Sequence, residues 1–371
     1  MKRLESLDIL RGIDLFALTI FGPLMLLLAK TGDYGWEAAV MPQFHHAAWE
    51  GFRVWDLIMP LFMFMSGVTI PYSMEKFKGR KKDAYFRILR RFAALWVLGM
   101  IAQGHLLDLN WHTLRFFSNT LQAIAVGYLF SAICFLEMKP KWQITTSAVL
   151  LLAFWALMTF CGGGNYAEHG NLCEIVDNAV LGAHRDQASI AADGSLFVNP
   201  EYSYTWIISS LTFIVTVMTG MFAGEILKDD KRSEKRKMLI LLAVGAGMLA
   251  AGWLWSLLGM PVIKKIWTSS MTLVASGYCF LLLLAIYYLV DYRKKCRWLG
   301  FFKIWGMNSI LAYMVYQVLR GPLAALSEVF LHGFALYLPD GWYKFVIGIG
   351  SALIQGLLLW FCYKRKIYLK V

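Results

Sequence analysis

The sequence predicts an all-α protein with about ten transmembrane helices and with both ends of the chain in the cytoplasm. Of its 371 residues, 58% are hydrophobic and 16% are charged, and the mean hydropathy is +0.54. A soluble domain is nearer half apolar and a quarter charged. One spanning helix needs about 20 mostly apolar residues. The length therefore allows about ten spans in a single transmembrane domain, residues 1–371, and leaves no room for a soluble domain.

Ten apolar runs divide the chain into candidate spans. They fall at roughly residues 12–29, 54–73, 92–107, 117–136, 143–161, 205–227, 238–258, 267–290, 303–320 and 344–363. Each run is predicted to be a helix, because lipid tolerates no open strand edge. The first run is interrupted by Asp14 and lacks a clean small-residue cleavage site. It is therefore predicted to be a retained helix and not a removed signal peptide.

Basic residues collect in alternate loops, which sets the predicted orientation. With the amino terminus inside, the cytoplasmic loops hold Lys76, Lys78, Arg80, Lys81, Lys82, Arg87, Arg90, Arg91, Lys139, Lys141, Lys228, Lys231, Arg232, Lys235, Arg236, Lys237, Arg293, Lys294, Lys295, Arg297, Lys364, Arg365, Lys366 and Lys370. The opposite loops hold Arg53, Arg115, Arg185, Lys264, Lys265, Arg320 and Lys344. This asymmetry predicts an even number of spans. It also explains the net charge of +12 without a nucleic-acid partner.

Two outer segments stand out from the short connections. Residues 162–204 form the longest loop, predicted to be extracytoplasmic, and long loops in compact proteins are usually functional. Residues 30–53 contain His46 in the run His45-His46-Ala47-Ala48-Trp49-Glu50. If that stretch is helical, His46, Trp49, Glu50 and Arg53 share one face. A histidine beside a carboxylate can act as a general base; the alternative is an interfacial histidine among aromatic residues.

Three further polar residues are candidates for function. Asp56 lies near the outer end of the second span, where a carboxylate usually faces a partner or a cavity. It is predicted to orient a histidine or bind a cation, and the alternative is a snorkelling carboxylate. Lys264 lies in a predicted outer loop, where cations are few. It either binds an anion or lies at the membrane interface. Asn308 either caps a helix or binds a ligand. No Walker loop, GxSxG elbow, HExxH or Rossmann pattern occurs. The six Cys contain no CxxC pair, so no metal is expected.

Several motifs occur in an order that resembles one family. They are Arg3-Leu4-Glu5-Ser6-Leu7-Asp8-Ile9-Leu10-Arg11-Gly12, the segment from His46 to Gly51, the segment from Asp56 to Phe64, Leu121-Gln122 with Tyr128, Asn199-Pro200-Glu201, Pro261 with Lys264, Trp267 and Thr268, and Gly306-Met307-Asn308-Ser309. Together they span nearly the whole chain. The chain resembles the membrane acyltransferase family of heparan-α-glucosaminide N-acetyltransferase.

The resemblance implies an acetyltransferase of a bacterial cytoplasmic membrane. It implies that acetyl-CoA from the cytosol is the co-substrate, and that a sugar or glycan amine or hydroxyl on the far side is the acceptor. It assigns His46 and Asp56 to catalysis, and Lys264, Trp267, Asn308 and Gln122 to binding of acetyl-CoA. The lipid bilayer is the expected surrounding, and a homodimer is left open.

The resemblance also suggests a disulfide between Cys161 and Cys173. Both lie at or beyond the outer end of the fifth span, in an oxidising compartment if the topology holds. The alternative is two free thiols.

Two other functions compete with acetyl transfer. One is a transporter or flippase for an amphiphilic sugar, in which His46 and Asp56 couple transport to protons. The other is a glycosyltransferase that uses lipid-linked sugars. Such an enzyme would need a metal or a carboxylate cluster on its outer loops, where the sequence has only scattered carboxylates.

Overall fold

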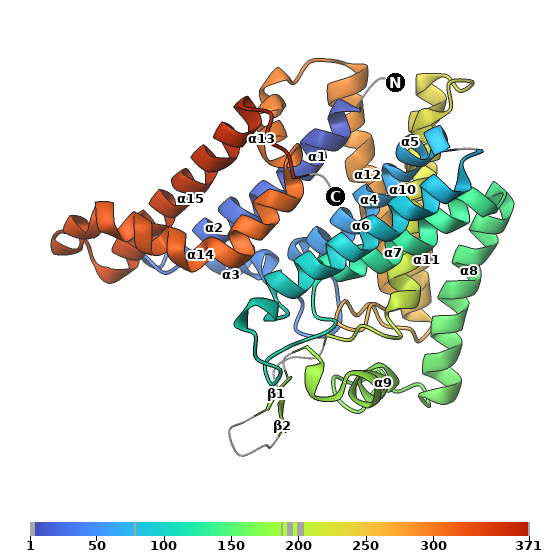
Figure 1. The fold of residues 1–371 in the computed structure, drawn as a ribbon, viewed down its shortest axis with the longest axis horizontal. Coiled ribbons are helices and arrows are strands. Elements are labelled where there is room, and N and C mark those ends of the chain that lie inside the picture. Colours follow the sequence, from blue (N-terminus) through green and yellow to red (C-terminus); the bar gives the residue numbers. More distant parts are fainter. Residues whose placement is uncertain (1–3, 78, 187, 191–195, 199–203, 370–371) are drawn as a thin grey trace. The chain divides into compact units, whose positions relative to one another are not determined.

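The computed structural model describes residues 4–77, 79–186, 188–190, 196–198 and 204–369. Helices dominate the chain (Figure 1). It divides into two compact units. Unit 1 contains the chain up to His46, then Arg53–Ile58 and the part from Leu282 onwards; unit 2 contains Ala47–Phe52 and Met59–Leu281. Each unit is described by itself.

Unit 1 is built from the two ends of the chain. Its elements are α1 (Glu5–Phe16), η1 (Ala17–Phe21), α2 (Gly22–Leu28), α3 (Glu37–Val40), η2 (Met41–Phe44), η3 (Val54–Leu57), η8 (Tyr288–Tyr292), η9 (Arg297–Phe302), α13 (Lys303–Gly306), α14 (Ser309–Leu331), η10 (His332–Leu336) and α15 (Asp340–Lys364). Here η denotes a 3-10 or π-helical segment.

Unit 2 holds the middle of the chain. Its elements are α4 (Ile58–Val68), α5 (Ile70–Met74), η4 (Glu75–Phe77), α6 (Lys81–Ala102), η5 (Leu106–Asp108), α7 (Thr120–Glu137), α8 (Pro140–Ala156), η6 (Leu157–Cys161), α9 (Leu172–Leu181), η7 (Gly182–His184), β1 (Ala188–Ile190), β2 (Leu196–Val198), α10 (Ser210–Lys228), α11 (Glu234–Leu257) and α12 (Ser269–Tyr287). The chain passes between the units after His46, after Phe52, after Ile58 at the start of α4, and after Leu281 within α12.

The predicted polytopic helical class is confirmed. Among the described residues, nine helices are long and apolar enough to cross a membrane: Glu5–Leu28, Val54–Phe77, Thr120–Glu137, Pro140–Cys161, Ser210–Lys228, Glu234–Leu257, Ser269–Tyr292, Ser309–Leu336 and Asp340–Lys364. α6 has 22 residues and is long enough to be the tenth, at ~33 Å. Its amino-terminal half carries Arg87, Arg90 and Arg91, which lower its hydropathy but can reach the interface with their charged ends.

Close packing in unit 1 depends on glycines of α1 and α13. A Cβ at Gly12 would collide with the Phe302 carbonyl, and one at Gly306 would collide with the Asp8 carbonyl. The Phe16 ring packs edge-on against the Trp305 ring, with 5.1 Å between the centroids. α1 is therefore held tightly against the segment that precedes α14.

Glycines also allow close packing in unit 2, between α4 and α10. Gly220 and Gly224 of α10 lie against the backbone carbonyls of Phe64 and Val68. Small residues four apart let two membrane helices approach closely. The Phe64 ring also packs edge-on against Phe280 of α12, with a centroid separation of 5.1 Å. These contacts place α4, α10 and α12 at the centre of the unit.

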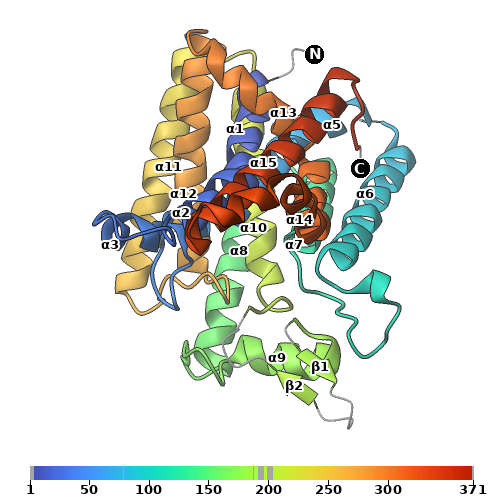
Figure 2. The same ribbon diagram turned by 90° about the vertical axis from the view of Figure 1, so that its left-hand side faces the viewer.

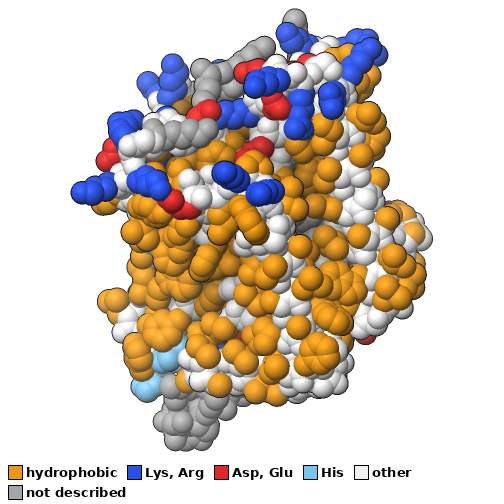
Figure 3. Space-filling view, turned by 90° about the vertical axis from the view of Figure 1, so that its right-hand side faces the viewer, with side chains coloured by type: hydrophobic (Ala, Val, Ile, Leu, Met, Phe, Trp, Pro, Cys, Tyr) orange, Lys and Arg blue, Asp and Glu red, His pale blue; other side chains and the backbone are white. Residues whose placement is uncertain are grey.

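The basic loops of unit 2 meet at one end of that unit. Lys81 at the start of α6 pairs with Glu137 at the end of α7, with 2.7 Å between Nζ and Oε2. Lys228 at the end of α10 pairs with Glu75 and donates a hydrogen bond to the Pro71 carbonyl at 2.7 Å. Figure 3 shows Lys and Arg gathered at one end of a largely apolar face. This grouping agrees with the predicted alternation of loops.

The remaining loops of unit 2 contact one another at the opposite end. Lys265 Nζ lies 3.0 Å from Glu168 Oε1, and the Phe116 amide donates to the His184 carbonyl at 3.0 Å. α9, β1 and β2 lie at this end (Figure 2). Residues 162–204 thus contain a helix and an antiparallel strand pair. Which end faces the cytoplasm stays a prediction.

Two predicted boundaries are wrong. The run 92–107 corresponds to α6, which begins already at Lys81, so Arg87, Arg90 and Arg91 lie inside a helix and not in a loop. The run 303–320 was expected to end at residue 320, yet α14 begins at Ser309 and continues through Pro322 to Leu331. Arg320 and Lys344 therefore lie inside α14 and α15 and not in an outer loop. A proline removes one backbone hydrogen bond, and neighbouring groups in membrane helices compensate for that loss.

Candidate functional site

His46 and Asp56 form a paired site in unit 1. His46 Nδ1 lies 2.8 Å from Asp56 Oδ1; the Asp56 side chain is 0% exposed and that of His46 is 40% exposed. An ionised carboxylate can only accept hydrogen bonds, so the histidine must donate Nδ1–H to it. In a neutral imidazole the proton is then absent from Nε2. The arrangement gives a histidine with a fixed tautomer and an accessible edge.

The backbone around the pair holds both side chains. Asp56 Oδ2 accepts the Arg53 amide hydrogen at 2.9 Å, and Arg53 Nη1 donates to the His46 carbonyl at 3.1 Å. The Gln43 side chain accepts the Val54 amide hydrogen at 3.1 Å. A carboxylate held by two partners has little freedom to rotate, so Asp56 orients the imidazole.

The segment around His46 is not the helix that the spacing suggested. His45 has extended backbone angles, φ −114° and ψ 151°, and residues 46–53 form bends and extended chain. The carboxylate that the structure pairs with His46 is that of Asp56. Partners more than a hundred residues away determine this path. The Trp49 indole donates to the Tyr166 carbonyl at 2.7 Å, and the Gly51 amide donates to the Val262 carbonyl at 2.8 Å.

Aromatic side chains close in sequence to His46 and Asp56 pack on one another within unit 1. The Phe44 ring lies 5.6 Å from Phe21 and 5.8 Å from Trp55, measured between centroids. A Cβ at Gly22 would collide with the Trp55 ring. The turn before His46 is thereby packed onto η1 and the start of α2.

Lys264 and Trp267 lie together in unit 2, on the segment before α12. Lys264 is 5% exposed, and its Nζ lies 6.0 Å from the centroid of the Tyr204 ring. Trp267 is 1% exposed and has a φ of 52°. Its indole donates to Thr216 Oγ1 at 3.1 Å, so it fixes this turn on α10.

Gln122 and Asn308 are fully engaged in holding backbone. In unit 2, Gln122 accepts the Ser118 amide hydrogen at 2.9 Å and donates to the Phe116 carbonyl at 2.5 Å. In unit 1, Asn308 donates to the Ile367 carbonyl at 2.9 Å and accepts the Leu369 amide hydrogen at 3.0 Å. The Asn308 side chain does not cap α14, so the capping interpretation is wrong. Asn308 instead binds the backbone of the carboxy-terminal segment.

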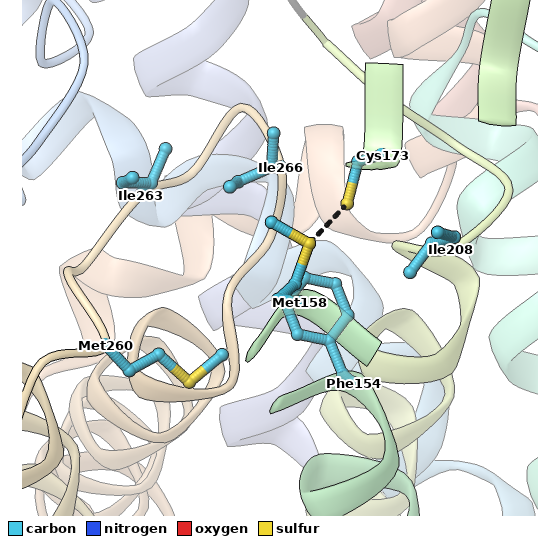
Figure 4. Close-up of a cluster of buried hydrophobic side chains, with 7 residues drawn as sticks. All are labelled: Phe154, Met158, Cys173, Ile208, Met260, Ile263 and Ile266. Atoms are coloured by element: carbon cyan, nitrogen blue, oxygen red, sulfur yellow. Dashed lines mark hydrogen bonds between the residues drawn. The ribbon is translucent and has the colours of Figure 1, made fainter. Parts of the chain in front are cut away.

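The suggested disulfide between Cys161 and Cys173 is not formed. Both thiols are free. Cys173 points into a cluster of buried hydrophobic side chains, with its Sγ 3.5 Å from Met158 Sδ (Figure 4). Burial raises its pKa to about 12. Cys161 ends η6 in an exposed position, so the two side chains have different surroundings.

Asp177 is a buried carboxylate that the sequence reading missed. It is 2% exposed and accepts the Trp206 and Ile207 amide hydrogens at 2.7 and 2.9 Å. Burial raises its pKa to about 6, although those two bonds and Arg185 act in the opposite direction. A lone Asp in a helix gave no signal of this role, because its partners lie 29 and 30 residues further along the chain.

No group of three or more His, Cys, Asp or Glu suited to a metal ion occurs among the described residues. No family model matches the chain. The chain is similar to heparan-alpha-glucosaminide N-acetyltransferase of Homo sapiens, with 26% identity over 371 aligned positions that cover 85% of this chain and 53% of the human protein. It is also similar to the Mus musculus protein of the same name, with 24% identity over 431 positions, 100% of this chain and 61% of the mouse protein.

The chain is similar to both proteins at modest identity. The likeness covers most of the chain, as the order of the motifs predicted. The chain spans little more than half the length of the curated relatives that it matches.

Proposed function

We propose that the chain is a membrane acetyltransferase with His46 as its general base and Asp56 as the carboxylate that orients it. The observation that carries this proposal is the His46–Asp56 pair, with 2.8 Å between Nδ1 and Oδ1 and with Asp56 fully buried. A base fixed in one tautomer by a buried carboxylate is the arrangement that acyl transfer uses on unrelated folds. The relatives are named as N-acetyltransferases, which supports the same chemistry.

The proposed reaction needs one proton acceptor near the attacking atom. The acceptor amine attacks the thioester carbonyl of acetyl-CoA, and His46 Nε2 takes the proton from the amine nitrogen. The C–S bond breaks, and coenzyme A leaves as the thiol after it receives that proton. We infer a sugar amine as the acceptor, since the relatives' name specifies a glucosaminide; a sugar hydroxyl would use the same base.

The chemistry can follow either of two routes. In a ternary complex the amine attacks acetyl-CoA directly, and positioning supplies much of the rate. In the other route the acetyl group rests on His46 first. We favour the ternary route because a bound amine needs only proton removal and orientation.

The remaining candidate residues act on acetyl-CoA in two different ways in this proposal. The ammonium group of Lys264 lies next to the Tyr204 ring. It is the candidate for contact with an anionic part of acetyl-CoA. Gln122, Trp267 and Asn308 have their polar atoms engaged inside the protein. They would support donor binding through the segments that they hold.

The proposed setting is a bacterial cytoplasmic membrane with both chain ends inside. The multi-pass character rests on the nine membrane-compatible helices among the described residues. The orientation rests on the basic end of unit 2. Acetyl-CoA would then come from the cytosolic side and the sugar from the other side.

A sugar transporter coupled to protons is the second candidate, because a His–Asp pair can also carry protons. Purified full-length protein in liposomes separates the two functions. Radiolabelled acetyl-CoA is supplied on one side, glucosamine and its oligomers on either side, and the products are analysed by mass spectrometry. Acetylated sugar that requires acetyl-CoA supports the enzyme. Sugar uptake that needs no acetyl-CoA, with no acetylated product, would contradict it.

A further inference from the structure

Unit 1 contains a cavity that the His46 site does not use. It has a volume of about 380 Å³ and lies between η1 and α2 on one side and α14 and α15 on the other. Its lining includes the aliphatic side chains of Leu24, Leu27, Leu323 and Ile347. The volume and the apolar lining with a few polar groups are typical of small-molecule sites.

Two buried polar groups line this cavity. Thr19 is 5% exposed and Gln355 is 4% exposed. Thr19 Oγ1 and Gln355 Nε2 have no hydrogen-bond partner among the described residues. A buried donor without a partner costs stability. Both groups can donate a hydrogen bond, so together they suit an oxygen acceptor.

The charged residues of the cavity do not favour an anion. Arg320, Glu328, Asp340 and Lys344 are two cations and two anions. Lys344 Nζ lies 2.7 Å from Asp340 Oδ2, and the Arg320 guanidinium lies over the Tyr316 ring, 5.5 Å from its centroid. The charges are therefore largely balanced near the α14–α15 turn. Thr19 and Gln355 are neutral, and an ionised group beside them would be costly.

The cavity is long as well as apolar. Asp340 and Gln355 both line it, and they are about four turns of α15 apart, or ~22 Å along the helix axis. Half of a bilayer, including its headgroup region, is ~21 Å thick. A lining of this length in a membrane helix matches one leaflet and accommodates an extended hydrocarbon chain.

We propose that this cavity binds the carbonyl end of an uncharged long-chain lipid. The carbonyl oxygen accepts hydrogen bonds from Thr19 and Gln355, and the chain lies along Leu24, Leu27 and Leu323. An isoprenoid quinone and a neutral fatty acyl ester share this chemistry. The proposal does not rest on acetyl transfer.

Photoaffinity labelling tests the proposal. The full-length protein in lipid nanodiscs is labelled with a fatty acid methyl ester that carries a diazirine, and the labelled peptides are mapped by mass spectrometry. Labelling is expected on peptides that contain residues 19–27 and 347–355. Competition by decylubiquinone distinguishes the quinone from the ester. The free fatty acid should compete at least tenfold less well, and equal competition would overturn the requirement for an uncharged group.

A double variant isolates the two donors. Thr19→Val with Gln355→Leu should lower the labelling roughly tenfold or more, the effect of two lost hydrogen bonds. Its melting temperature without ligand should be equal to or above that of the unchanged protein, because two unpaired buried donors are removed. Thr145→Val, an exposed threonine on α8, is the matched control and should not change the labelling. Labelling that survives in the double variant, or that is spread evenly over exposed helix faces, would mean bulk lipid only and would overturn the proposal.

Discussion

The buried carboxylate of Asp177 should make the anchoring of α9 depend on pH. Burial raises its pKa to about 6 from an ordinary 3.8, so the state in which α9 is packed against Trp206 and Ile207 favours the protonated form. When that contact opens locally and Asp177 meets water, the carboxyl regains its ordinary pKa. The stabilising contribution is therefore complete below pH 4 and is lost as the pH rises through 6. At 1.36 kcal/mol for each pKa unit, the loss is about 3 kcal/mol.

Hydrogen exchange measures this effect locally. The protection of the Trp206 and Ile207 amides, corrected for the intrinsic exchange rate at each pH, should fall about a hundredfold between pH 4 and pH 7. Asp177→Asn should remove the pH dependence, because an amide does not titrate. This expectation requires that burial raises the pKa of Asp177 more than the two amide hydrogen bonds that it accepts lower it. Protection that rises with pH would show that those bonds dominate, and the argument would be refuted.

Three further predictions concern thiols, helix packing and topology. Cys161 should react with a maleimide in the folded protein while Cys173 reacts only after unfolding, since Cys173 is buried and its pKa is raised to about 12; a Cys161–Cys173 peptide in a non-reducing digest would contradict this. Gly220→Leu should lower the melting temperature strongly, because its Cβ would collide with the Phe64 carbonyl and overpacking costs about 1–3 kcal/mol or more, whereas Gly247→Leu, with nothing within 4 Å of its Cβ, should not. In intact cells an impermeant thiol reagent should label a cysteine placed at Ser189 and not one placed at Ser233; the reverse result would contradict the ten-span topology.

Local composition predicted the helices well, because hydropathy and loop charge are properties of short segments. The run around α10 and the run around α15 were placed to within a few residues. The predicted helix ends were wrong where contacts with residues distant in sequence determine the end of a helix. α14 continues to Leu331, well past the predicted end at residue 320. Pro322 is tolerated inside it because neighbouring groups in a membrane protein compensate for a missing backbone hydrogen bond.

The candidate site was predictable in part for the same reason. Asp56 was expected to orient a histidine or to bind a cation, and the structure places it against His46. The helical path from His46 to Arg53 was wrong, because contacts of Trp49 with Tyr166 and of Gly51 with Val262 pull the chain out of a helix. Thr19, Gln355 and Asp177 gave no sequence signal, since their significance comes from burial alone.

The role of His46 can be measured directly with three variants in the liposome acetylation assay. A general base contributes about 10²–10⁴-fold, so His46→Ala should lower acetyl transfer by at least a hundredfold. His45→Ala is the matched control, because it also removes one histidine. It should retain most of the activity, since the His45 side chain is exposed. Asp56→Asn should fall between the two, since the imidazole keeps its place but loses the carboxylate that fixes its tautomer.

The kinetics of the unchanged protein distinguish the two routes of transfer. Intersecting lines in two-substrate plots support the ternary route, and parallel lines with acetyl-labelled protein support an acyl-histidine.

The most direct single measurement of the central claim is acetyl transfer by His46→Ala at saturating acetyl-CoA. We expect a loss of at least a hundredfold in a variant that is still folded and still binds coenzyme A. Near-normal transfer by that variant would contradict the assignment of His46 as the base.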